Sequence, residues 1–388
     1  MANVLDDLAA DIYKAADIVG RELVGFTPAV TVNNSVEEVA LGQNVRSHFT
    51  RQASTKDISP SMTIPEGDDQ TIDNKVLNLT RQRGVEIPWT GEDINFVNSG
   101  PGYETIYGDQ ITQAMRALVN EVETDLATEV YQNASRAVGE AGTTPFGSNF
   151  DVIAQGRQIL ADNGMPVNDN RTSLVMNTIA GTRLRNLAQL QRANEAGGDT
   201  LLRQGVLLDL QGVMMRESAQ VQSHTAGTVT GDPTVTGANS IGATTINVTT
   251  GAGEAVDVSA GDIISFAGDD NEYVVAEAAD IAADATGDVV IHSPGLRQAT
   301  AGGEIVSAQG AYTGNAFVHQ ASTELAMRAP ANPVGGDAAV DRMIVQDPHS
   351  GLVFEVSTYK GFKKAMILVG AVWGYKAWKP DAIGLLMG

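Results

Sequence analysis

The sequence predicts an α+β protein in which one mixed domain is interrupted by an all-β module. Three features support this fold class: a long amphipathic helical pattern over residues 103–138, strand patterns on both sides of it, and a compositional change at residues 224–310. The 388 residues, 43% of them hydrophobic, suffice for two or three domains with a buried core. No apolar run approaches the ~20 residues of a membrane helix, so no membrane contact is expected.

Residues 1–43 are expected to form an N-terminal arm with one short amphipathic helix. Apolar residues recur at helical spacing from Val4, and Gly25 followed by Thr27-Pro28 ends the pattern. The helix either packs on its own domain or reaches a neighbouring copy, and the pattern leaves both options open. Because no basic segment precedes an apolar one near Met1, we expect no secretory signal.

Residues 44–93 are predicted to form a long β-hairpin. Its ascending side covers 45–58, its polar tip lies at 65–69, and its descending side covers 75–90. An isolated two-stranded ribbon is marginal in water and exposes unpaired backbone groups, so we favour an intermolecular role over packing on its own sheet. The candidates for contacts between subunits are Arg51, Lys56, Glu66, Asp68, Asp69, Arg81, Arg83 and Glu86.

Residues 94–170 are predicted to contain a spine helix and a second, shorter helix. The spine helix, over 103–138, would be about 50 Å long at 1.5 Å per residue. Its apolar positions do not sustain a heptad, which disfavours a coiled coil. The second helix is expected from Phe150 to Asn163-Gly164, where a glycine can adopt the left-handed conformation that ends a helix.

Residues 171–223 and 311–388 are predicted to be two parts of one mixed domain. A buried strand over 172–177 leads to a helix over 178–191 that Asn177 can cap. No glycine-rich phosphate loop follows this strand, so a nucleotide site is unsupported. In the second part, 317–327 looks helical, 352–357 alternates like a half-buried strand, and the apolar run 365–373 predicts a central strand.

Residues 224–310, which we call the β module, contain short strand patterns separated by Gly/Asp turns. Such a pattern predicts a small barrel or sandwich inserted into the mixed domain. The β module carries twelve acids and one base, Arg297, and thus half of the net charge of −22. A chain this acidic is not expected to grip nucleic acid over its whole surface, because phosphate contacts need Lys and Arg.

No residue pattern in the chain predicts catalysis. There is no cysteine, the five histidines form no HxxxH or HExxH pair, and 268–272 lacks the ligand spacing of a calcium loop. A GxSxG elbow and a phosphate-loop lysine motif are also missing. We therefore expect no catalytic residues, no metal, no cofactor and no enzymatic activity. Five lysines gather near the C-terminus: Lys360, Lys363, Lys364, Lys376 and Lys379. Aromatic residues are interleaved with them, and we favour core packing over nucleic-acid recognition for these aromatic residues.

The order of these elements resembles the tailed-bacteriophage major capsid (coat) proteins with the Hong Kong 97-like fold. Within them it looks most like the coat proteins of short-tailed Salmonella-type phages, which carry an inserted β-barrel domain. The stretches that carry the likeness are 202–218, 261–268, 311–327 and 372–384. The insertion is shorter and more acidic than that subfamily leads us to expect.

The resemblance implies a role for each segment. Residues 1–43 would be the N-arm, 44–93 the extended E-loop, 94–170 the spine helix and peripheral domain, 171–223 and 311–388 the axial domain with its closing strands, and 224–310 the inserted barrel-like domain. The protein would assemble as hexamers and pentamers into an icosahedral shell, first a procapsid and then a mature capsid, enclosing the phage genome.

The resemblance also implies partners and a location. The partners would be a scaffolding protein, a portal and packaged double-stranded DNA in non-specific proximity, and the protein would assemble in the host bacterial cytoplasm before residing in the virion capsid. Two alternatives remain. One is an encapsulin-like nanocompartment shell, which the inserted acidic module disfavours, and the other is a β-rich surface or adhesion protein, which the long helices and missing signal disfavour.

Overall fold

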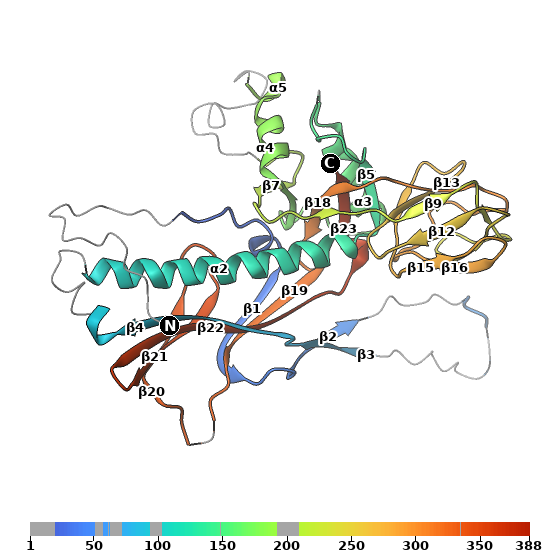
Figure 1. Ribbon diagram of the computed structural model, residues 1–388. Helices are drawn as coiled ribbons and strands as arrows, with labels where there is room; N and C mark the ends of the chain where they lie inside the picture. Colours follow the sequence, from blue (N-terminus) through green and yellow to red (C-terminus); the bar gives the residue numbers. More distant parts are fainter. Residues whose placement is uncertain are drawn as a thin grey trace.

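A computed structural model describes residues 20–50, 57–60, 62, 72–93, 103–147, 149–191, 209–333 and 335–388 of the chain. Helix α2 (Tyr103–Gln132) crosses the molecule, with one large sheet below it and a second sheet, the shorter helices and the β module above and beside it (Figure 1). In this described part, no helix is long and apolar enough to cross a membrane. The other helical segments are η1 (Thr27–Ala29), α3 (Asp151–Asp162), α4 (Thr178–Arg185), α5 (Ala188–Gln191) and η2 (Pro380–Ala382).

The sheet below α2 is built around β22 (Lys364–Ala377), which contains the apolar run of the sequence. β22 pairs antiparallel with three strands, so the prediction of a central strand is confirmed. Leu118, Val122 and Leu126 of α2 share one core with Val369 and Trp373 of β22. The other strands of this sheet are β1 (Thr31–Val39), β4 (Arg81–Thr90), β19 (Thr323–Pro330), β20 (Ala339–Gln346) and β21 (Val353–Gly361).

A nine-stranded sheet forms the second layer. Its central strand β18 (Tyr312–His319) pairs with β23 (Ile383–Met387) and β6 (Thr172–Met176), and helices α3 and α4 share a core with it. As predicted, β6 is buried and Asn177 caps α4, with its Oδ1 accepting the Ala180 N–H at 2.7 Å. The remaining strands are β5 (Arg136–Gly139), β7 (Met214–Glu217), β8 (Ser223–His224), β13 (Ile263–Phe266), β14 (Glu272–Val274) and β17 (Val306–Ala308).

The β module has an apolar core of its own, in which Ile246, Val256 and Phe266 are buried. Its chain enters and leaves at neighbouring positions, because His224 of β8 pairs with Tyr312 of β18. It also joins the nine-stranded sheet, since β14 pairs antiparallel with β5. Its further strands are β9 (Thr228–Thr230), β10 (Thr234–Val235), β11 (Thr245–Thr249), β12 (Ala255–Val258), β15 (Ala279–Ile281) and β16 (Thr286–Val290).

Two helix predictions were wrong. The spine helix ends at Gln132, not at residue 138, because Ser135 donates its N–H and its hydroxyl to the Ile383 carbonyl and the chain continues as β5. The segment 317–327 is not helical but forms the end of β18, a turn and the start of β19. Its Leu, Ala and Met residues favour helices locally, yet β19 is held between β1 and β22 in the sheet, and tertiary pairing outweighs that preference.

The predicted hairpin differs from the structure on its descending side. β2 (Asn44–Thr50) pairs with β3 (Ile72–Asn78), from Asn44↔Asn78 to Thr50↔Ile72. After Leu79 and Thr80, residues 81–90 form β4, which pairs with β22 in the large sheet. The projecting ribbon is therefore shorter than the sequence suggested, and residues 81–90 belong to the body of the subunit.

A buried carboxylate fixes the N-terminal segment to α2. The side chain of Glu123 accepts five hydrogen bonds: from the N–H groups of Gly25, Phe26 and Thr27, and from the hydroxyls of Thr27 and Ser218, at 2.6–3.1 Å. A carboxylate this deeply buried is tolerated only when its lone pairs are satisfied. Glu123 therefore joins the segment around residues 25–27, the middle of α2 and the end of β7.

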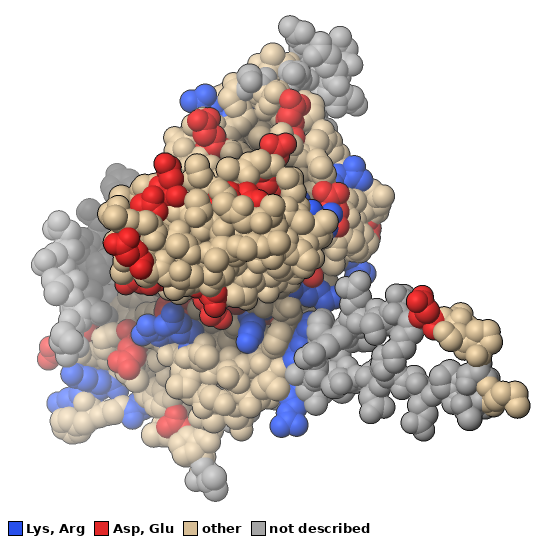
Figure 2. Space-filling view, turned by 90° about the vertical axis from the view of Figure 1, so that its right-hand side faces the viewer, with Lys and Arg blue, Asp and Glu red and all other residues tan. Residues whose placement is uncertain are grey.

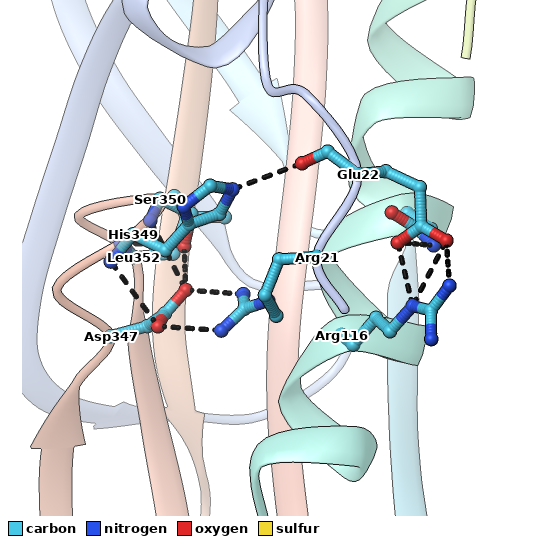
Figure 3. A network of polar contacts seen from close by, with 8 residues as sticks. Arg21, Glu22, Arg116, Asp347, His349, Ser350 and Leu352 are labelled. Carbon is cyan, nitrogen blue, oxygen red and sulfur yellow. Dashed lines mark hydrogen bonds and ion pairs between the residues drawn. The ribbon is translucent and has the colours of Figure 1, made fainter. Parts of the chain in front are cut away.

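Two ion pairs just before this segment strengthen the attachment (Figure 3). The guanidinium of Arg21 forms a two-pronged pair with Asp347 at 3.0 and 2.7 Å. Burial raises the pKa of Asp347, but hydrogen bonds from Arg21 and Ser350 outweigh it and lower the pKa to about 2. The carboxylate of Glu22 pairs with Arg116 of α2, and the hydrogen bond from Arg116 lowers the pKa of Glu22 to about 2.

We expect Glu123→Gln to lower the free energy of unfolding by about 3 kcal/mol, because an amide NH₂ would face donors that now meet a carboxylate oxygen. Urea denaturation followed by circular dichroism measures the change. Glu121→Gln is the matched control, since its half-exposed side chain lies two residues away on the same helix. Equal effects of the two substitutions would contradict the role of Glu123.

We expect acid to weaken the attachment of residues 21 and 22. The folded-state pKa of both Asp347 and Glu22 is about 2, below the values of 3.8 and 4.5 without such contacts, so their stabilisation is present above about pH 4 and lost as the pH falls toward 2. Unfolding free energies measured across this window should fall less steeply in Asp347→Asn than in the wild type. The exposed Asp341→Asn is the control and should keep the wild-type slope.

Candidate functional site

The strands β2 and β3 form a ribbon that leads away from the large sheet (Figure 1). Its base is fixed by a small apolar cluster, in which Leu77 and Leu79 pack on Ala326 and Val372. The backbone continues the attachment, because the Thr80 N–H donates to the Trp373 carbonyl at 3.2 Å. Within the part of the chain that the structure describes, β2 and β3 form a two-stranded sheet and pair with no other strand.

The base of the ribbon also carries lysines around one indole. The Nζ atoms of Lys75 and Lys376 lie 5.3 and 5.4 Å from the centroid of the Trp378 ring. Burial and the neighbouring Lys379 lower the pKa of Lys75. Gly374 permits the close approach of β3, because an added Cβ would lie 2.1 Å from the Asn78 carbonyl oxygen. The aromatic and cationic residues here therefore hold the ribbon on the large sheet.

Three of the predicted contact residues lie on β4 rather than on the ribbon. Arg81 contacts Asp125 of α2 at 3.3 Å, and Arg83 contacts Glu121 at 2.9 Å. Glu86 is exposed. The sequence marked α2 as a helix with a polar face, but it contained no signal for which strand would lie against that face. Arg81 and Arg83 thus contribute first to the attachment of β4 to α2.

The other five predicted contact residues lie outside the described residues: Arg51, Lys56, Glu66, Asp68 and Asp69. Two apolar residues that the prediction missed, Ile58 and Met62, are almost completely exposed between them in the sequence. The signal was available, because isolated large apolar residues beside a polar tip have no core to join. Covering such side chains with a partner removes apolar surface from water and is therefore favourable.

A third feature fixes the β module to the end of α2. His224 contacts Asp262 at 2.7 Å beside the rings of Tyr131 and Tyr312, and the Tyr312 hydroxyl donates to the Gly261 carbonyl at 2.6 Å. Burial raises the pKa of Asp262, but the hydrogen bond with His224 and those from backbone N–H groups outweigh it and lower the pKa. These contacts attach the β module to the end of α2.

Two observations bear on whether the described residues could hold a ligand. Among them, no group of three or more His, Asp or Glu side chains is placed to hold a metal ion. A cavity of about 500 Å³ lies beside Arg136, but its guanidinium already donates to Asn271, to Asn163 and to the Ile159 carbonyl. The arrangement is suited to positioning a ribbon and a module against other molecules.

Comparison with known proteins shows which solved structures share this fold. No family model matches the chain, and no curated protein matches it. Among solved structures, one of Mycobacterium phage Che8 is 12% identical with a TM-score of 0.52, covering 99% of this chain and 98% of that one. The capsid structure of the Cyanophage P-SCSP1u is 11% identical with a TM-score of 0.52, covering 98% of this chain and 93% of that one. At these identities the likeness shows the fold alone, and the chain therefore has the mixed α+β fold of phage capsid structures over nearly its whole length.

Proposed function

We propose that the chain is the major capsid protein of a tailed bacteriophage and acts as a shell subunit without catalytic activity. The observation that carries the proposal is the likeness in fold to a phage capsid over 98% of the chain. The projecting ribbon supports it, because a subunit that extends beyond its own core is suited to overlap with neighbours. Closed shells form from repeated copies, so each contact can be modest when many act together.

The proposal extends to the subfamily and its parts. In this view the ribbon is the E-loop, α2 the spine helix, the nine-stranded sheet the axial domain and the β module an inserted domain, as in coat proteins of short-tailed Salmonella-type phages. The separate apolar core of the β module supports its identification as an inserted unit. So does the pairing of His224 with Tyr312, which brings its two ends together.

The contacts between subunits follow from the same view. The tip residues Glu66, Asp68 and Asp69, with Arg51 and Lys56 on the ascending side, would meet the neighbouring copy in hexamers and pentamers. Exposed Ile58 and Met62 would add apolar contacts there. On β4, Glu86 is the better candidate, because Arg81 and Arg83 already bind α2.

The proposed surroundings are those of a phage shell. A scaffolding protein and a portal would be partners during assembly in the host bacterial cytoplasm, and double-stranded DNA would lie near the finished capsid wall without specific recognition. The net charge of −22 supports the last point, because so acidic a chain repels phosphates over most of its surface.

Expression of the chain, alone and with candidate scaffolding proteins, should yield closed shells in negative-stain electron microscopy. Purified particles from infected cells should contain nucleic acid, which absorbance at 260 and 280 nm measures. Particles that enclose an enzyme and no genome would favour a nanocompartment. Soluble monomers under every condition would refute a shell subunit of either kind.

Deletion of residues 66–70 should abolish shell formation, because it shortens the tip that reaches the neighbouring copy, while the circular dichroism spectrum stays that of the wild type. The triple variant Glu66→Gln/Asp68→Asn/Asp69→Asn keeps the length of the tip and removes its three negative charges. Comparing it with the deletion variant shows whether shell formation depends on the length of the tip or on its charge. Normal shells from the deletion variant would contradict the intermolecular role of the tip.

A further inference from the structure

The turn between β21 and β22 carries three lysines around an exposed aromatic ring, and we call residues 360–364 the lysine finger. Phe362 is 91% exposed, and the Nζ of Lys363 lies 6.0 Å from the centroid of its ring. Lys360 and Lys364 are also exposed. A phenylalanine in open solvent with cations on both sides is well suited to an acidic surface that has an apolar patch.

The lysine finger forms a tight turn attached to β4, although its sequence does not suit such a turn. Gly361 pairs with Lys364, which leaves Phe362 and Lys363 as a two-residue turn. Lys363 has a φ of 54°, a left-handed conformation that glycine or asparagine adopts at lower cost. The Gly91 N–H donates to the Lys363 carbonyl at 3.1 Å and fixes the turn to the end of β4. Neither the fold of the turn nor its solubility requires phenylalanine here, and an exposed ring flanked by lysines is suited to contact with a partner.

The β module offers a surface of opposite charge. Asp257 of β12 and Asp280 of β15 are exposed and lie directly opposite each other in an antiparallel pair. Like charges in this position repel, and within the described residues neither side chain has an ion-pair partner. Figure 2 faces this end of the molecule and shows acidic side chains along the rim of a largely uncharged face. A cation from outside would relieve the repulsion.

The two surfaces lie at opposite ends of the subunit. The lysine finger adjoins the end of β4 at the left of Figure 1, whereas β12 and β15 lie at the right, on the other side of the body. They therefore do not meet within one chain, but they meet between copies arranged head to tail. Such a heterologous contact generates closed rings when the rotation between copies closes.

We propose that the lysine finger of one copy docks on the Asp257–Asp280 surface of the β module of the next copy. This inference rests on the proposed shell function and adds a second contact between neighbours, independent of the ribbon. Phe362 would pack on the sheet of β9, β12 and β15, while Lys363 and Lys364 approach the two carboxylates. The occupant of the acidic surface is thus a second copy of this chain.

Charge reversal tests the pairing. Lys363→Glu/Lys364→Glu should lower the yield of shells by about tenfold or more at low salt, because it places like charges in the contact. Adding Asp257→Lys/Asp280→Lys to the same chain should restore the yield. The matched control adds Glu140→Lys/Asp151→Lys instead, which changes the net charge equally at exposed positions outside the β module and should not restore it. Equal rescue by both combinations would overturn the proposal.

A cross-link provides a readout that does not depend on yield. Because the chain has no cysteine, Phe362→Cys combined with Asp280→Cys introduces the only thiols. Under mild oxidation, assembled particles should give ladders of linked chains on non-reducing gels, whereas Phe362→Cys with Asp151→Cys should not. Shells that form normally without cross-links would overturn this contact and leave the shell function intact. Chains that neither assemble nor cross-link at any concentration would refute both.

Nucleic acid is the competing partner for the lysine finger, and fluorescence anisotropy with a double-stranded DNA oligonucleotide distinguishes it. We expect the wild type and Lys363→Glu/Lys364→Glu to bind the oligonucleotide equally weakly. Binding that is lost in the variant, with unchanged shell yield, would assign the lysine finger to nucleic acid and overturn its docking on a second copy.

Discussion

The position of Glu123 determines how the parts of this subunit are joined. Its carboxylate is buried within α2, and its five hydrogen bonds come from the N–H groups of residues 25–27 and from the hydroxyls of Thr27 and Ser218. The N-terminal segment is therefore bound to the helix before it enters the large sheet as β1. The pairs of Arg21 and Glu22 extend the same attachment along α2 and to the turn at residue 347.

Charge is distributed in this molecule according to structural unit. In the body several arginines pair with acids, such as Arg342 with Glu355 and Arg185 with Glu217. The β module has twelve acids with Arg297 as its single base, and its surface stays strongly negative. A unit with this potential repels copies of itself and attracts cationic surfaces, which favours ordered neighbours over random aggregation.

The sequence predicted those elements whose apolar pattern matches their final burial. The second half of the apolar run in β22 and all of β6 are buried, and Asn177 had the chemistry of a helix cap. The errors lie where distant pairing decides the conformation. The strand after Ser135 depends on the hydrogen bonds to Ile383, and β19 depends on its pairing with β22. Residues 81–90 pair with β22 along their whole length and therefore do not belong to the ribbon. The ion pairs of Arg81 and Arg83 with α2 could not be predicted either, because they depend on the same pairing of β4 with β22.

The side-by-side pairing of His224 and Tyr312 has a consequence for how such a chain changes over evolutionary time. Two strand residues that face each other across an antiparallel ladder can be joined by a tight turn or by a whole domain, with no change of register on either side. Inserted domains of different size and charge can therefore replace one another between residues 224 and 312 while the fold of the body stays the same. The limit on this exchange is the edge of β5, which β14 now covers and which any replacement must also protect.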